Sequence, residues 1–287
     1  MIVHMADSNV LRQPALIAYL RASRSHYIAL SDWTLNEMQK RNALSTSRES
    51  LRVVALFPDQ IGLLRKTHEL LDDKVTSNDD AAKLIDHQAT LDLIELARAL
   101  RQIPQPVDLA DRMTQAEAHA SEMMKRLKAE VEQFEPGLID AAAQFSDAEL
   151  AMIRKPGGAL PDDLRRKLIE LLLVTTGSFM LDNQVGQTKS PMKVSEAMKM
   201  FGFRYSLCTT IYYLEWVRIG RQTGLKVDLR VNDVIDMQVA AVGTFFCGVF
   251  SLDKRLHGIS QTARSILRQW GTYVGEDWSP ALPQQSP

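Results

Sequence analysis

The chain has 287 residues, of which 45% are hydrophobic and 24% are charged, and its formal net charge is −1. This composition is typical of a globular protein with one or two domains. The near-neutral charge gives no overall sign of nucleic-acid binding, although separate basic patches stay compatible with it. The most apolar stretches are too short to span a bilayer, and the two cysteines lie in apolar surroundings that favour free thiols. We therefore expect a cytoplasmic protein with no membrane association.

The first part of the chain predicts alternating strands and helices. The apolar run 2–6 predicts a buried strand that ends at Asp7, and residues 15–23 predict a helix. Residues 27–31 predict a second strand, and the helix after it has Ser31 or Asp32 as its N-cap. This order is typical of an α/β fold.

The middle of the chain predicts helices and almost no strands. Long helical patterns cover residues 79–103, 111–134 and 162–181. The α/β pattern returns late in the chain, where a helix capped by Asn232 or Asp233 precedes a buried strand at 248–251 and a helix at 260–270. Residues 272–275 predict a last edge strand.

These elements predict an α/β fold in which both chain ends build one parallel sheet flanked by helices. The α/β core is expected to comprise residues 1–43 and 200–275, with a mainly α-helical insertion at 44–199. The polar, proline-bearing end at 276–287 predicts a flexible tail.

Four acidic residues occupy the same kind of position in these elements. Asp7 and Asp253 each follow a predicted strand, whereas Glu37 and Asp236 lie early in predicted helices. Ligands of parallel sheets gather at the carboxyl ends of strands and at the amino ends of the helices that follow. Clustered carboxylates repel one another unless a cation is present, and oxygen ligands suit Mg²⁺ or Mn²⁺. The pattern therefore predicts a magnesium or manganese site.

Three segments resemble the motifs of PIN-domain nucleases. "IVHMADSNVL" is similar to the opening strand and Asp-x-Asn, and "ALSDWTLNEMQK" is similar to the second motif, a strand followed by a Glu-bearing helix. "NDVIDMQVAAVGTFFCGVFSLDKRL" resembles the joined third and fourth motifs. The resemblance covers both chain ends, implies a PIN-like fold, and leaves the helical middle outside the family pattern.

The resemblance also implies roles for individual residues. Asn9 would orient Asp7, and Ser251 would support the site. The implied reaction is hydrolysis of a single-stranded RNA phosphodiester by metal-activated water, in a toxin or defence protein. The implied catalytic residues are Asp7, Glu37, Asp236 and Asp253, and the implied metal ligands are these four and Asp233.

Basic and aromatic residues suggest where RNA would bind. Aromatic side chains alternate with basic ones before the third motif, and such a pattern can stack bases and neutralise phosphates. The alternative is that the aromatic residues face the core and the basic residues form a solvated helix face. The candidate phosphate contacts are Arg41, Arg48, Arg204 and Arg221.

All of these acidic residues except Asp236 also have a local explanation. Asp7 can end a strand in a turn, Asp233 can cap a helix, and Glu37 can pair with Arg41 one helical turn later. Two other protein classes therefore stay open: a catalytically inactive PIN-like module that binds RNA or protein, and a helical interaction protein. A homo-oligomer or an inhibitory partner protein is compatible with either enzyme or module.

Overall fold

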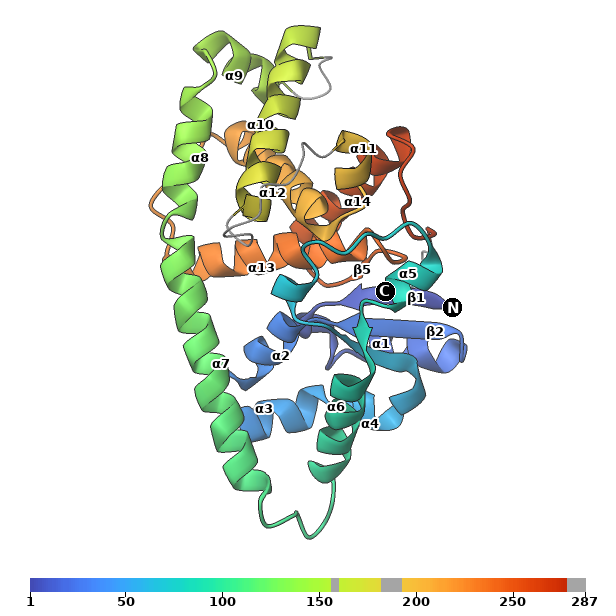
Figure 1. Cartoon of the computed structure of the whole chain (residues 1–287). Helices are drawn as coiled ribbons and strands as arrows, with labels where there is room; N and C mark the ends of the chain where they lie inside the picture. Colours follow the sequence, from blue (N-terminus) through green and yellow to red (C-terminus); the bar gives the residue numbers. More distant parts are fainter. Residues whose placement is uncertain (156–159, 182–192, 278–287) are drawn as a thin grey trace, which may run out of the picture.

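The computed structural model describes residues 1–155, 160–181 and 193–277, which contain a five-stranded sheet (Figure 1). The strands follow the spatial order β4-β3-β2-β1-β5. All pairs are parallel except that of β3 with β4. The first and last strands in sequence are therefore neighbours, as expected for a sheet built from both chain ends. The strand bounds are β1 (Ile2–Ala6), β2 (His26–Leu30), β3 (Ile61–Leu64), β4 (Ile85–Asp86) and β5 (Val249–Phe250).

Strand β1 is buried on both faces and fixes the register of its neighbours. Met5 pairs with Ala29 of β2 on one side and with Val249 of β5 on the other. Successive side chains of a strand point to opposite faces. Accordingly, Val3 and Met5 enter one hydrophobic cluster and Ala6 enters the other.

One face of the sheet is covered by helices from the first hundred residues. These are α1 (Pro14–Ala22), α4 (Arg52–Leu56) and α6 (His87–Ala99), whose apolar side chains share a cluster with β2 and β3. Helix α2 (Asp32–Gln39) follows β2, and the Ser31 hydroxyl accepts a hydrogen bond from Thr34 N–H at 3.2 Å. The predicted N-cap at Ser31 is therefore confirmed. Helix α3 (Ala43–Ser50) belongs to the same cluster, whereas Ala81 of helix α5 (Asn78–Ala82) enters the cluster on the other face of the sheet.

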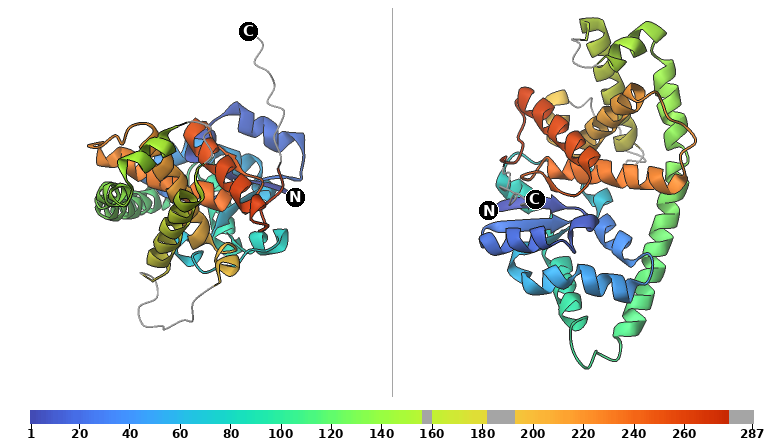
Figure 2. Two further views of the ribbon diagram at one scale, coloured as in Figure 1. Left: turned by 90° about the horizontal axis from the view of Figure 1, so that it is seen from above. Right: turned by 180° about the vertical axis from the view of Figure 1, so that it is seen from behind.

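The opposite face is covered by helices from the last third of the chain (Figure 2). These are α12 (Phe201–Arg218), α13 (Val227–Gly243) and α14 (Lys254–Gln269), with α10 (Asp162–Leu181) packed outside α12. Helix α13 comes very close to β5 at Gly243. A Cβ atom there would lie 2.6 Å from Cγ1 of Val249, so a side chain at this position would push the helix away from the strand.

Helix α7 (Leu109–Val131) runs along one side of the molecule and connects the two helical regions (Figure 1). In its first half, Oε2 of Glu117 accepts a hydrogen bond from Ala43 N–H of α3 at 2.9 Å. Near its end, Lys128 pairs with Asp228 of α13 at 2.5 Å. Three further helices pack in the region of α12, α13 and α14: α8 (Phe134–Ala143), α9 (Asp147–Arg154) and α11 (Val194–Ala197).

The expectation of almost no strand between residues 44 and 199 is wrong. β3 and β4 lie in this range and belong to the central sheet, so the α/β part extends well beyond residue 43. The run "IGLL" is too short for its apolar pattern to distinguish a strand from a helix. The predicted helix at 79–103 is divided, because Asp86 ends β4 and caps α6 by accepting a hydrogen bond from Ala89 N–H at 2.9 Å.

Two further expectations for the end of the chain are wrong. Residues 272–275 form no strand, since the Tyr273 carbonyl accepts a hydrogen bond from Arg204 rather than from a strand neighbour. Helix α13 begins at Val227, ahead of the predicted cap. At the start of the predicted tail, Asp277 pairs with Arg264, and residues 278–287 lie outside the described residues. None of the helices formed by the described residues is long and apolar enough to cross a membrane.

Candidate acidic site at the carboxyl edge of the sheet

Asp7 lies immediately after β1, where its carboxylate is held in one orientation. The residue is 7% exposed. Its Oδ2 accepts hydrogen bonds from Asn9 Nδ2 at 2.5 Å and from the Ser251 hydroxyl at 2.7 Å. The backbone N–H of Asp7 also donates to Phe250 O of β5 at 3.0 Å. The parallel pairing of β1 with β5 thus brings residues from both chain ends to one carboxylate.

Asn9 and Ser251 connect Asp7 to the turn after β5. Nδ2 of Asn9 donates to the Ser251 hydroxyl at 3.1 Å, and Oδ1 of Asn9 accepts from Leu252 N–H at 3.0 Å. The Ser251 hydroxyl accepts in addition from Asp253 N–H at 3.0 Å. This network fixes the turn that carries Asp253 relative to Asp7.

Glu37 reaches the same edge from helix α2. Its Oε2 accepts a hydrogen bond from the Ser8 hydroxyl at 2.8 Å, and that hydroxyl lies 3.4 Å from Asp7 Oδ1. Burial raises the pKa of Glu37, the negative charge of Asp7 acts in the same direction, and the Ser8 hydrogen bond and Lys40 oppose them. Sequence reasoning missed Ser8 as the bridge between the two carboxylates, although its place inside the first motif was a usable signal.

Asp253 serves as the N-cap of helix α14. Its Oδ1 accepts hydrogen bonds from Arg255 N–H at 2.7 Å and from Leu256 N–H at 3.1 Å. A carboxylate at this position satisfies helix donors and interacts favourably with the helix dipole. Asp253 therefore has a structural role whether or not it binds an ion.

Asp236 approaches the group from the middle of α13 and not, as expected, from the start of the helix, and its side chain is 16% exposed. Its pKa is raised to about 8, chiefly by burial and then by the negative charges of Asp7 and Asp253, while Arg255 opposes the shift. Such mutual repulsion requires that the carboxylates lie near one another. The charges of Asp7 and Asp253 therefore act on the Asp236 carboxylate.

Asp233 is engaged by other side chains. It is 4% exposed, its Oδ2 accepts a hydrogen bond from the Tyr212 hydroxyl at 2.6 Å, and its Oδ1 pairs with Nη2 of Arg255. Arg230 lies 3.8 Å from the same carboxylate. Because α13 begins six residues earlier, at Val227, the reading of Asp233 as an N-cap is wrong. Its carboxylate instead holds α12 and α14 against α13.

The acidic group has a positively charged neighbour that the sequence reasoning did not identify. Nη2 of Arg255 lies 3.8 Å from Asp236 Oδ2 while it pairs with Asp233. Within residues 1–155, 160–181 and 193–277, no three His, Cys, Asp or Glu side chains are grouped so that they could hold a metal ion. The predicted ligands are thus neighbours, but they are not arranged as a ready-made coordination sphere.

The predicted phosphate contacts have different environments. Arg204 is fully buried, stacks on the Phe245 ring at 3.8 Å, and donates to Met198 O, the Thr244 hydroxyl and Tyr273 O. It cannot contact RNA, so this prediction is wrong. The remaining three arginines are exposed, and the aromatic residues between the basic ones are buried, which confirms the alternative that these rings face the core. The exposed arginines are Arg41, Arg48 and Arg221, and the buried aromatic residues are Tyr205, Tyr212 and Trp216.

No protein-family model, curated protein or solved structure matches this chain.

Proposed function

We propose that the chain is a metal-dependent endoribonuclease of PIN-like type that hydrolyses RNA phosphodiester bonds. The observation that carries this proposal is the hydrogen-bond network at the sheet edge. Ser251 joins Asp7 to the turn of Asp253, and Ser8 joins Asp7 to Glu37. Three acidic motifs that are far apart in sequence therefore meet at the edge where parallel sheets gather their ligands.

The chemistry of the donors fits Mg²⁺ or Mn²⁺. Asp7, Glu37, Asp236 and Asp253 offer only carboxylate oxygens, which these ions prefer. Burial raises the pKa of Asp236 most, and the negative charges of Asp7 and Asp253 add to the shift, which a bound cation would oppose. An ion next to Asp236 would compete with the guanidinium of Arg255, which lies 3.8 Å away.

The residues of the chain would position the reacting groups. When bound, the ion would lower the pKa of a water molecule and offset charge on the phosphate. Asn9 and Ser251 keep the Asp7 carboxylate in one orientation, and Ser8 does the same for Glu37. The proposed reaction is direct attack of water on phosphorus, with no covalent intermediate on the enzyme.

Cleavage of a labelled single-stranded RNA tests this function. The chelator-treated protein should be inactive, and Mg²⁺ or Mn²⁺ should restore cleavage. Asp7→Asn and Asp253→Asn should each abolish it. Asparagine is also a good N-cap, so Asp253→Asn removes the charge while it preserves the cap of α14. Asp140→Asn, at an exposed position of α8, is the matched control that should keep full activity.

A second candidate is an RNA-binding module of PIN-like type that does not cleave. It is favoured by Arg255, which supplies the acidic group with a positive charge from within the chain. Tight binding of RNA without cleavage in either metal would support this module and contradict the nuclease.

A further inference from the structure

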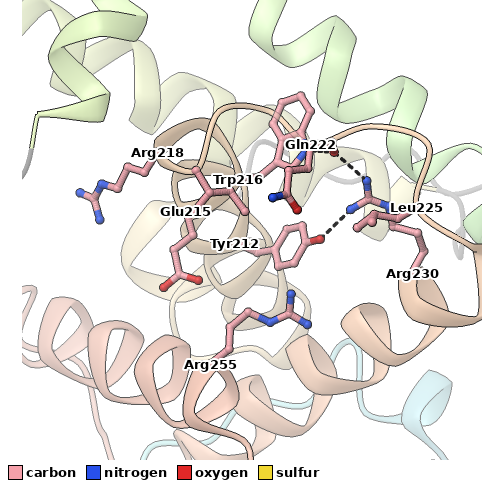
Figure 3. Close-up of a pocket in the computed structure, with 9 residues that line it drawn as sticks. Tyr212, Glu215, Trp216, Arg218, Gln222, Leu225, Arg230 and Arg255 are labelled. Carbon is pink, nitrogen blue, oxygen red and sulfur yellow. Dashed lines mark hydrogen bonds between the residues drawn. The ribbon is translucent and has the colours of Figure 1, made fainter.

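A cavity of about 260 Å³ lies between α12, α14 and the segment that connects α12 with α13 (Figure 3). Its wall is largely apolar, with contributions from Tyr212, Trp216, Ile219 and Leu225. The indole N–H of Trp216 donates to Gln222 O at 2.7 Å, which fixes the ring. Ligand pockets that enclose drug-sized molecules measure about 300–1,000 Å³, so this cavity suits a single planar ring system.

The side chains that line the cavity include three arginines and one carboxylate. Arg218 and Arg255 line it, against one lining carboxylate, that of Glu215. Burial raises the pKa of Glu215, and the two arginines oppose that shift. Arg230 lies in the wall, where it donates to the Tyr212 hydroxyl at 2.8 Å, and its charge is paired with that of Glu135 at 2.9 Å. Its Nε is buried without a hydrogen-bond partner in the described structure.

Arg255 links this cavity to the acidic site. Its guanidinium lies 5.4 Å from the centre of the Tyr212 ring, which forms part of the cavity wall. The same guanidinium pairs with Asp233 and lies 3.8 Å from Asp236 Oδ2. A molecule in the cavity therefore lies next to the acidic site and shares a side chain with it.

We propose that this cavity binds one nucleotide of the single-stranded RNA substrate, beside the phosphodiester bond that is cut. The base would pack against the part of the wall that Tyr212 and Trp216 form, and its phosphate would lie near Arg255, whereas the Arg218 guanidinium points away from these rings (Figure 3). Aromatic walls and arginine side chains are how proteins hold unpaired bases and their phosphates. This inference rests on the proposed function. A free mononucleotide has the same chemistry, and the experiment separates it from RNA.

The test fills the cavity and measures RNA binding without metal. Gln222→Trp adds a ring to the lining and keeps the backbone carbonyl that Trp216 requires. In the presence of a chelator, this variant should raise the Kd for a labelled single-stranded RNA about tenfold, and Arg255→Ala should also raise it. Leu229→Trp places the same ring on α13 at an exposed site outside the cavity, and Arg98→Ala removes an exposed charge from α6. Neither control should change the Kd.

Measurements of RNA cleavage and of RNA binding distinguish the nuclease proposal from the cavity proposal. If metal-dependent cleavage occurs but Gln222→Trp changes neither Kd nor rate, the cavity proposal is overturned and the nuclease stands. If Gln222→Trp weakens RNA binding but no metal yields cleavage, the nuclease fails and the nucleotide site stands. A third outcome is that adenosine monophosphate binds the wild type, fails to bind Gln222→Trp, and is not displaced by RNA. The occupant of the cavity is then a free nucleotide, and the RNA proposal is overturned.

Discussion

The hydroxyl of Ser251 donates a hydrogen bond to Oδ2 of Asp7 at 2.7 Å, across a separation of 244 residues in the chain. The same hydroxyl accepts from Asp253 N–H at 3.0 Å. One serine therefore couples the carboxylate after β1 to the turn after β5. The parallel pairing of these two strands makes the contact possible.

Replacing Ser251 with alanine should disturb Asp7 without removing any charge. We expect Ser251→Ala to lower the free energy of unfolding by about 1 kcal/mol, because the three hydrogen bonds of the hydroxyl are lost. The apparent affinity for Mn²⁺ in cleavage assays should fall about 10–100-fold, as is common when the partner of a metal ligand is lost. Ser251→Thr keeps a hydroxyl and should retain most of the affinity. Unchanged Mn²⁺ dependence in the alanine variant would show that Ser251 has no part in the site.

Replacing Asp236 with asparagine should stabilise the metal-free protein at pH 7, because a carboxyl group whose pKa is raised to about 8 must bind a proton when the chain folds. The carboxylate is buried beside Asp7 and Asp253, so we expect Asp236→Asn to raise the free energy of unfolding in chelator by about 1 kcal/mol. Thermal unfolding should show that Mn²⁺ raises the Tm of the wild type, because an ion that binds only the folded state stabilises it. This rise should disappear in Asp236→Asn. Persistence of the rise in the variant would place the ion elsewhere, and Asp140→Asn is the control with an unchanged response.

Arg204 should matter for stability and have no role in RNA binding. Arg204→Met leaves Met198 O, Thr244 Oγ1 and Tyr273 O without their donor, so we expect a loss of about 3 kcal/mol in chemical unfolding. Arg48→Met changes an exposed arginine of α3 and should alter stability by less than about 0.5 kcal/mol. A fully stable Arg204→Met protein with weakened RNA binding would contradict this assignment.

Asp277 should contribute a small stabilisation that depends on pH. A hydrogen bond from Arg268 lowers the pKa of Asp277, with Arg264 acting in the same direction and burial opposing them. A carboxylate with a lowered pKa stabilises the fold above its ordinary value and loses this contribution as the pH falls through the lowered value. The carboxylate is largely exposed, so we expect Asp277→Asn to cost only about 0.5 kcal/mol at pH 7.

The pH dependence of unfolding checks this prediction. The stability of Asp277→Asn and of the wild type should converge as the pH drops below 3.8, the ordinary value for aspartate. A difference that persists unchanged at low pH would mean that shape, and not charge, explains the effect. Asp140→Asn controls for the loss of a negative charge alone.

Local patterns in the sequence were sufficient for several elements. The strand before Asp7, the strand that precedes α2 and the Ser31 cap follow from short-range rules of apolar runs and capping residues. Helix α10 matches the predicted range 162–181. The sequence also indicated an α/β sheet made from both chain ends, because apolar runs with polar ends occur near each terminus.

Tertiary structure decided what each polar group contacts. Arg204 looked like a surface cation, but carbonyl oxygens from distant segments satisfy it inside the core. Arg255 faces Asp233 and Asp236 only because α14 packs beside α13. β3 enters the sheet because β2 offers it a parallel partner. Local sequence preferences act over a few residues, whereas burial and charge pairing depend on neighbours that only the folded chain brings together.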